Sequence, residues 1–241
     1  MKKIIYFSLF FTTSLCFCQN YTVVYNLEQV SKNYNLKTVL KTFLQGNGES
    51  SLYVEDFQKA QSASDIGGSV LNMPTENNPT YYKDLKQNSV TYNDHIRLTF
   101  FNIKDAVGKI DWKINNETKQ ILDYNCQQAT VIFRGRTFKV FFTSDISISD
   151  GPLKFSGLPG LILEVVSDDD IASFHYLAES IKLNEKKSEV KNVYAGKDII
   201  TYEQYVTKYE QKYNEALTRI INDRGETRPM SKGFMEVLIK N

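Results

Sequence analysis

The sequence is poor in the residues that form disulfides and metal sites. It has three cysteines, and two of them, Cys16 and Cys18, lie in an apolar N-terminal segment. Removal of that segment leaves Cys126 as a single thiol, which excludes a disulfide within the chain. The two histidines, His95 and His175, are 80 positions apart. Because zinc sites usually draw on closely spaced ligands, we expect no metal site. We also expect no cofactor, since no phosphate loop, dinucleotide fingerprint or nucleophile elbow is present.

The chain is also nearly neutral and has no apolar run long enough to span a membrane. Its 29 basic and 28 acidic residues leave a formal charge of +1, which gives no field to attract nucleic acid. The apolar stretch at residues 4–17 is shorter than the roughly 20 residues that a membrane-spanning helix needs. We therefore expect neither a nucleic-acid partner nor an integral membrane protein.

Residues 1–18 have the order of a secretory signal peptide. Residues 1–3 carry two lysines, an apolar centre follows, and we predict cleavage between Cys18 and Gln19. The alternatives are a retained membrane anchor and a lipidated cysteine, and the bulky Phe17 before Cys18 disfavours the second. We expect an exported protein of the periplasm or cell envelope, with association with the outer membrane as a further option.

Aromatic residues, by contrast, are abundant, with fifteen tyrosines and fifteen phenylalanines. Aromatic and β-branched residues suit a pleated, half-buried surface, so residues 19–241 predict one mainly β domain. We expect a curved antiparallel sheet or open half-barrel. Strand patterns occur at 21–30, 36–44, 52–54, 89–92, 96–103, 109–114, 129–133, 137–142, 161–166 and 171–183. Residues 58–80 have few large apolar side chains, which predicts a flexible loop.

The C-terminal part predicts an amphipathic helix at residues 202–222, packed on the sheet. Thr201 and Gln204 have the spacing of a capping box. Tyr202, Tyr205 and Tyr209 recur at helical intervals and form an aromatic stripe. Packing against the sheet explains this stripe, and a ligand platform is the alternative.

A hairpin is predicted around Gly135. Residues 129–133 and 137–142 are two strand-forming runs joined by a short connection, in which Gly135 supplies a positive φ. Arg134 and Arg136 flank the glycine, and a hairpin tip exposes its side chains. We expect both arginines to be solvated, with a grip on a carboxylate or phosphate as the alternative.

Two turns are predicted further along the chain. Asp150, Gly151 and Pro152 form a turn signal. Pro159 and Gly160 suit the second and third positions of a type II turn, in which Gly160 has the positive φ. On this interpretation a β-branched residue at position 160 would strain the backbone.

Two further groups are candidates for chemistry. Residues 168–170 are three aspartates that have the oxygen ligands of a Ca²⁺ site but lack its spaced ligand pattern, so solvated side chains are the alternative. Cys126 and His175 would make a nucleophile and base if they met. Cys126 lies at the start of a strand rather than at a helix N-terminus, which favours a buried structural thiol. We therefore assign no catalytic residue.

The segment around the second turn resembles the GLPGLI family of exported Bacteroidota proteins. The family signature is present as Gly157, Leu158, Pro159, Gly160, Leu161 and Ile162. The resemblance covers roughly residues 108–166 and includes Cys126, Gly135, Asp150, Gly151 and Pro152 in order and spacing. It implies export but supplies no substrate and no catalytic residue. The expected sheet is also similar to the half-barrels of LolA-type lipoprotein carriers, an analogy of fold that implies no transport function.

Together these observations predict a cell-envelope accessory module without evident catalysis. Its expected partner is an apolar or peptidic ligand, or an outer-membrane transporter. One alternative is a hydrolase or redox enzyme that uses Cys126, and another is a structural component of a surface complex.

Overall fold

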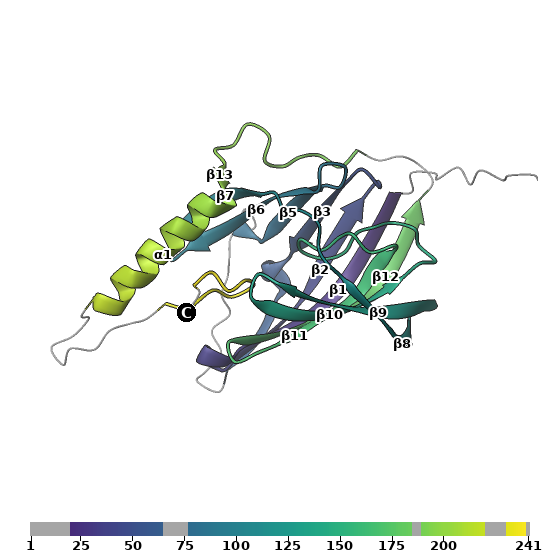
Figure 1. The fold of residues 1–241 in the computed structure, drawn as a ribbon, viewed down its shortest axis with the longest axis horizontal. Coiled ribbons are helices and arrows are strands. Elements are labelled where there is room, and N and C mark those ends of the chain that lie inside the picture. The colour runs from purple at the N-terminus through teal and green to yellow at the C-terminus, as the bar shows by residue number, and fades with distance from the viewer. Residues whose placement is uncertain (1–19, 65–76, 185–188, 220–229, 240–241) are drawn as a thin grey trace, which may run out of the picture.

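One large sheet with a single helix against it forms the described part of the molecule (Figure 1). The computed structural model describes residues 20–64, 77–184, 189–219 and 230–239. The strand order is β13-β7-β6-β5-β3-β2-β1-β12-β11-β10-β9-β8, and β4 pairs with β2 beside this path. All pairs are antiparallel except β13 with β7. The sheet is strongly curved, and this confirms the mainly β, open curved sheet with a C-terminal helix.

The strands in the first half of the chain are β1 (Asn20–Ser31), β2 (Leu36–Gly46), β3 (Ser50–Glu55), β4 (Gln61–Ser64), β5 (Thr80–Asp84), β6 (Ser89–Ile96) and β7 (Thr99–Asp105). Those in the second half are β8 (Lys113–Ile121), β9 (Tyr124–Phe133), β10 (Arg136–Thr143), β11 (Leu161–Asp168), β12 (Ala172–Asn184) and β13 (Ile200–Thr201). Two short 3-10 helices, Lys32–Tyr34 and Phe57–Lys59, follow β1 and β3.

The core lies on the inner, concave face of the sheet, and the alternation of side chains along the strands explains this. In β1, Tyr21, Val23, Tyr25 and Leu27 are fully buried, whereas the residues between them are part-exposed. Successive side chains of a strand point to opposite faces, so one face of β1 is apolar and the other is polar. The neighbouring strands continue this pattern, and aromatic side chains fill the inner face.

The hairpin predicted around Gly135 is confirmed. Arg134 and Gly135 connect β9 to β10, and both have positive φ, 49° and 81°. A two-residue connection with positive φ at both positions matches the twist of the flanking strands. The predicted strand at 96–103 is instead interrupted by a turn, because Arg97 has a φ of 57° between β6 and β7. The predicted strand at 109–114 begins later, at Lys113.

Helix α1 spans Tyr202–Thr218 and packs on the sheet beside β7 and β13 (Figure 1). The predicted capping box is present: the Thr201 hydroxyl accepts from the Gln204 N–H at 3.2 Å, and the Gln204 side chain accepts from the Thr201 N–H at 2.9 Å. Tyr202, Tyr205 and Tyr209 are buried, so the stripe faces the sheet. The helix ends at Thr218 rather than at 222, and residues 220–229 lie outside the described part.

Two predictions concern segments that are partly or wholly undescribed. The signal peptide at 1–18 lies outside the described residues. The loop predicted at 58–80 contains β4, which pairs with the first half of β2, and β5 starts at Thr80. The centre of that segment, residues 65–76, is not described. The start of the predicted loop therefore forms a strand, β4. The sequence did not predict it, because its residues are small or polar and show no apolar alternation.

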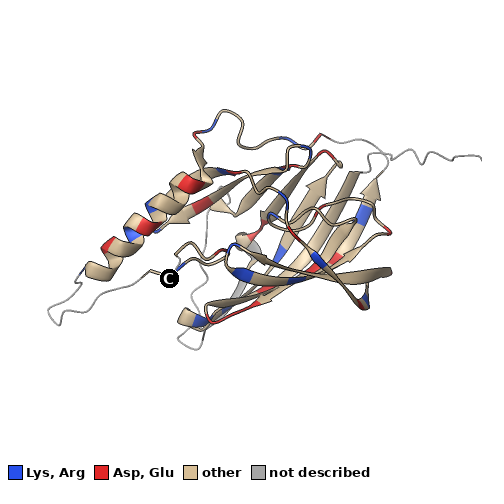
Figure 2. Cartoon of the chain, viewed as in Figure 1, with Lys and Arg blue, Asp and Glu red and all other residues tan. Residues whose placement is uncertain are grey.

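Charge is spread over the described surface. In Figure 2, basic and acidic residues alternate along α1. Among the described residues, no helix is both long and apolar enough to cross a membrane.

Candidate functional site

A cavity of about 300 Å³ lies on the inner face of the sheet. Its walls come from β3, β5 and β6, from α1, and from the C-terminal segment, residues 230–239. We call it the tyrosine pocket. Its lining includes aromatic side chains, from Tyr81, Tyr92, Tyr205, Tyr209, Phe100 and Phe234. It also includes charged side chains, from Glu55, Asp94, Lys154 and Glu236.

A row of tyrosines crosses three adjacent strands behind the pocket. Tyr53 of β3 is in register with Tyr81 of β5, which is in register with Tyr92 of β6. The Tyr81 and Tyr92 rings are stacked, with centroids 5.3 Å apart, and the Tyr53 and Tyr81 rings are 5.8 Å apart. Tyr176 of β12 meets the edge of Tyr53 at 6.5 Å. Because paired residues on one face of a sheet are neighbours, the register of these strands builds the row.

A second row holds two carboxyl groups. Glu55 follows Tyr53 by two positions in β3, and Asp94 follows Tyr92 by two positions in β6. The two strands run in the same direction because each is antiparallel to β5, so both carboxyl groups lie on the same side of the tyrosine row. Their backbones are two strand spacings apart, about 10 Å.

Glu55 is buried among hydroxyl groups. Glu55 is 4% exposed. The hydroxyl groups of Tyr53 and Tyr176 both donate a hydrogen bond to its Oε1, each at 3.2 Å. Within the described part of the chain, the other oxygen, Oε2, has no hydrogen-bond donor. Burial raises the pKa of Glu55 to about 7, although the two tyrosine hydroxyls oppose the shift. A carboxyl group with this pKa is poised to exchange a proton near neutral pH.

The other charges around the pocket balance one another. Lys154 Nζ lies between Asp105 at 3.0 Å and Glu236 at 2.6 Å, and 3.9 Å from the centroid of the Tyr92 ring. Arg134 also pairs with Asp105, at 2.8 Å. The two cations, Lys154 and Arg134, therefore pair with two carboxylates, Asp105 and Glu236. In the described residues, no lysine or arginine forms an ion pair with Glu55 or Asp94.

The C-terminal segment, residues 230–239, lies between α1 and the β9–β10 hairpin (Figure 1). It lines the pocket with Phe234, Met235, Glu236 and Leu238. The Val237 N–H donates to the Arg134 carbonyl at 3.0 Å, and the Tyr209 hydroxyl donates to the Ser231 carbonyl at 2.9 Å. The Phe234 ring meets the edge of Phe174, 5.1 Å away. No sequence prediction covered this segment, because an irregular chain without periodicity carries no signal for its packing.

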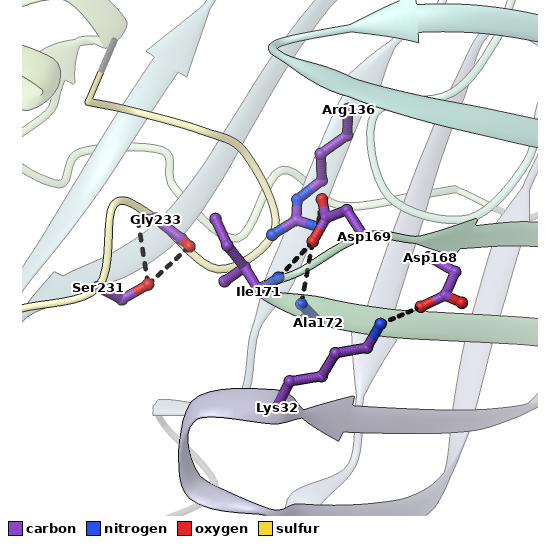
Figure 3. A network of polar contacts seen from close by, with 8 residues as sticks. All are labelled: Lys32, Arg136, Asp168, Asp169, Ile171, Ala172, Ser231 and Gly233. Carbon is purple, nitrogen blue, oxygen red and sulfur yellow. Dashed lines mark hydrogen bonds and ion pairs between the residues drawn. The ribbon is translucent and has the colours of Figure 1, made fainter. Parts of the chain in front are cut away.

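Figure 3 shows where Arg136 of the hairpin and two of the three aspartates, Asp168 and Asp169, lie. Arg136 is 1% exposed and pairs with Asp169, and Asp168 pairs with Lys32 at 2.6 Å. Asp169 Oδ1 also accepts from the N–H groups of Ile171 and Ala172. Although burial alone would raise it, these N–H groups and the Arg136 guanidinium hold the pKa of Asp169 below its usual value.

The prediction of solvated arginines is therefore wrong. β12 returns beside β11 and brings the aspartate turn to the hairpin, a contact across 33 positions of sequence. Arg134 lies over the Tyr202 ring at 3.7 Å, in addition to its pair with Asp105. Within the described ranges, no three His, Cys, Asp or Glu side chains gather in a way that could hold a metal ion.

The predicted turn at Asp150, Gly151 and Pro152 is buried. Asp150 pairs with Lys83 and accepts from the Tyr21 hydroxyl, and the Lys83 ammonium also donates to the Gly151 carbonyl. A Cβ at Gly151 would press on Ile162. The segment, which the sequence marked only as a turn, is thus a buried polar anchor against the sheet.

The family-signature segment, residues 157–162, leads into β11. Gly157, not Gly160, has the positive φ, 93°, so the predicted type II turn with positive φ at Gly160 is wrong. Gly160 is required for a different reason: a Cβ there would overlap the Thr143 carbonyl. The Ile162 N–H donates to the Asp150 carbonyl at 2.9 Å, and its carbonyl accepts from the Tyr25 hydroxyl at 2.7 Å. The signature therefore joins β11 to the core.

No hydrogen bond joins Cys126 to either histidine in the described part of the chain. Cys126 is 1% exposed, its Sγ lies 3.6 Å from the Tyr124 carbonyl, and burial raises its pKa to about 11. His175 Nε2 is instead 2.8 Å from Glu164 Oε1, and His95 lies beside Asp94. A thiol with this pKa remains protonated near neutral pH.

A family model described as "N-glycanase peptide, N-terminal domain" matches residues 33–204. No curated protein matches the chain. A solved structure of PNGF-II, in space group P21, is 17% identical with a TM-score of 0.52, over 81% of this chain and 34% of that one. A second, in space group C2, is 19% identical with a TM-score of 0.48, over 80% and 32%. An uncharacterized conserved protein from Thermus thermophilus is 6% identical with a TM-score of 0.37, over 77% and 91%.

The chain spans about a third of the PNGF-II structures it matches. At this identity the likeness to the P21 structure concerns the fold alone.

Proposed function

The chain belongs to the family of the N-glycanase peptide, N-terminal domain, and from this membership we propose that it is a cell-envelope accessory module. It binds part of a glycopeptide in the tyrosine pocket and performs no catalysis of its own. The ligand class follows from the family name, because an N-glycanase acts where a glycan is joined to a peptide.

The tyrosine pocket is the observation that carries this proposal. Its volume of about 300 Å³ is within the range of small-ligand sites. Tyrosine rings offer flat apolar surfaces for the C–H faces of a sugar, and their hydroxyl groups, with Glu55 and Asp94, offer hydrogen-bond partners for sugar hydroxyls. A concave site with aromatic walls and a few polar groups is the usual form of a binding site for a small polar ligand.

The state of Cys126 supports a binding role over catalysis. A nucleophile needs a base within hydrogen-bond reach and a path for the substrate. Cys126 is buried, its thiol has a raised pKa, and His175 is engaged with Glu164. The tyrosine pocket contains no cysteine among the described residues that line it.

Export and the narrower family assignment belong to the same proposal. The signal peptide at 1–18 would place the domain outside the cytoplasm, in the periplasm or cell envelope. The GLPGLI signature, residues 157–162, lies within the region that the family model matches, which is compatible with membership of the GLPGLI family. A transporter of the outer membrane would be a partner for such a module, and an apolar or peptidic part of the ligand would contact the pocket walls.

A calorimetric titration tests the proposal. The probe is an N-terminally acetylated, N-linked glycopeptide with one lysine, added to the mature chain. Phe100 lines the pocket and is 42% exposed, whereas Phe43 is 38% exposed and is absent from the pocket lining. We expect Phe100→Ala to weaken binding at least fivefold and Phe43→Ala to leave it unchanged. If the unaltered chain does not bind the glycopeptide, or if the two variants weaken binding equally, the proposal fails.

A further inference from the structure

The geometry points to a more specific ligand group: we propose that the tyrosine pocket takes a primary ammonium group, held by Glu55 and Asp94 against the tyrosine rings. This inference rests on the proposed binding function and names the chemistry that the pocket selects. Its source is either the lysine side chain of a peptide or an amino sugar, and the two sources share the same R–NH₃⁺ group.

The charge balance around the pocket is the first argument. Lys154 and Arg134 neutralise Asp105 and Glu236. In the described part of the chain no lysine or arginine pairs with Glu55 or Asp94. Asp94 lies 3.6 Å from His95 Nδ1, whereas Glu55 faces the cavity with no basic partner among the described residues. Burying an unpaired carboxylate is unfavourable, and a bound cation would remove that penalty. An anionic ligand would increase it.

The position of Glu55 is the second argument. Both hydroxyl donors, from Tyr53 and Tyr176, are used on Oε1, whereas Oε2 has no donor among the described residues. Glu55 itself lines the cavity. An ammonium group has three N–H donors and can satisfy this oxygen directly. The Asp94 backbone is two strand spacings, about 10 Å, from that of Glu55, and the Asp94 carboxylate would add to the negative potential that attracts the cation.

The aromatic walls supply the third argument, and Lys154 provides an internal precedent. Its ammonium group lies 3.9 Å from the Tyr92 centroid and 5.1 Å from that of Tyr202. Both distances are within the range in which a ring face attracts a cation. Tyr81 is stacked on Tyr92, and Tyr205 approaches from α1, so a second ammonium group would meet similar surfaces.

A metal ion fits the same carboxyl groups less well. Calcium takes six to eight oxygen ligands, and the described residues form no cluster of three metal-ligating side chains. The ammonium group needs fewer partners and gains from the rings, which a hydrated metal ion does not.

The experiment compares ligands that differ in one charge. The glycopeptide with one lysine is titrated beside a copy in which that lysine is Nε-acetylated, and glucosamine is titrated beside N-acetylglucosamine. We expect the ammonium member of at least one pair to bind tenfold or more tightly than its acetylated copy. Preference within the peptide pair would identify a lysine as the source, and preference within the sugar pair an amino sugar.

Variants then place the effect in the pocket. Glu55→Gln keeps the shape of the side chain and an acceptor for the two tyrosines, and it should reduce the preference for ammonium at least fivefold. Asp94→Asn should reduce it less. Glu28→Gln is the control, because Glu28 is part-exposed, pairs with Lys37 at 2.8 Å, and is not among the described residues that line the pocket.

The outcomes separate this inference from the proposed function. If the acetylated glycopeptide binds as tightly as the original and glucosamine shows no advantage over its acetylated copy, the ammonium inference fails while the binding function stands. If neither glycopeptide binds, the binding function fails. If the preference exists but survives both Glu55→Gln and Asp94→Asn, the ammonium site lies elsewhere and the inference is wrong.

Discussion

Two buried acidic residues on the inner face of the sheet have opposite surroundings. Asp150 is fully buried, pairs with the buried Lys83, and accepts from the Tyr21 hydroxyl. Glu55 is almost as buried, but its donors are two neutral tyrosine hydroxyls. The first site is closed, since the Lys83 ammonium group from β5 pairs with the acid. The second faces a cavity and has no lysine or arginine partner in the described residues.

The difference separates a structural site from a binding site. A buried ion pair with added hydrogen bonds fixes the position of a segment, and removing one partner leaves an uncompensated charge. A buried acid without a cation lowers stability when it ionises, and such groups concentrate at functional sites. We therefore interpret Asp150 as an anchor of the family-signature region and Glu55 as part of a site.

The largest expected loss of stability is at the buried pair of Lys83 and Asp150. Lys83→Met removes the cation and should lower the free energy of unfolding by about 3 to 5 kcal/mol, because Asp150 would remain buried without its partner. Chemical denaturation with urea measures the change. In the double variant Lys83→Met with Asp150→Asn, much of the loss should be recovered. Equal stability of the single variant and the unaltered chain would contradict the structural interpretation of this site.

A substitution at Gly160 should cause the next largest loss of stability. Gly160→Ala brings a Cβ against the Thr143 carbonyl and should cost about 2 to 4 kcal/mol, as expected for overpacking against fixed backbone. The control is Gly108→Ala, since Gly108 has a φ of 69° but no atom near its missing Cβ, and should cost about 1 kcal/mol. If the two variants were equally stable, close contact with the Thr143 carbonyl would not explain why glycine occupies position 160.

At Glu55, in contrast, we expect a substitution to raise the free energy of unfolding. The pKa of Glu55 is raised to about 7, above the ordinary glutamate value of about 4.3, so the stability that neutral Glu55 provides is complete below about pH 4 and is lost as the pH rises through 7. Glu55→Gln has no carboxyl group to ionise, so the variant does not lose stability as the pH rises through 7. We expect the variant to be more stable by about 1 to 3 kcal/mol at pH 8 and nearly unchanged at pH 4. Thermal or urea unfolding at both values of pH measures this, and a variant less stable at pH 8 would contradict it.

The same comparison explains what the sequence can predict. Strand alternation, the two-residue hairpin at Gly135 and the capping box of α1 are local patterns, and all three are confirmed. The partners of Arg136 and Asp150 come from segments 33 and 67 positions away, and no local pattern encodes such contacts. The tyrosine pocket is missing from the sequence prediction for the same reason. Its residues become neighbours through the register of β3, β5 and β6 and through the C-terminal segment, residues 230–239.

The smallest expected effect concerns Cys126, a third buried ionisable group that belongs to neither site. It is on β9, away from the residues that line the pocket, and burial raises the pKa of its thiol to about 11. Cys126→Ala should therefore lower stability by no more than about 1 kcal/mol, the value of a small buried group, and leave glycopeptide binding unchanged. Iodoacetamide should modify the native thiol slowly at pH 8, because little thiolate is present, and rapidly in the unfolded chain. Rapid modification of the native protein together with loss of binding in Cys126→Ala would instead favour an enzyme that uses this thiol, and the contrast between the anchored Asp150 and the open Glu55 would no longer locate the function.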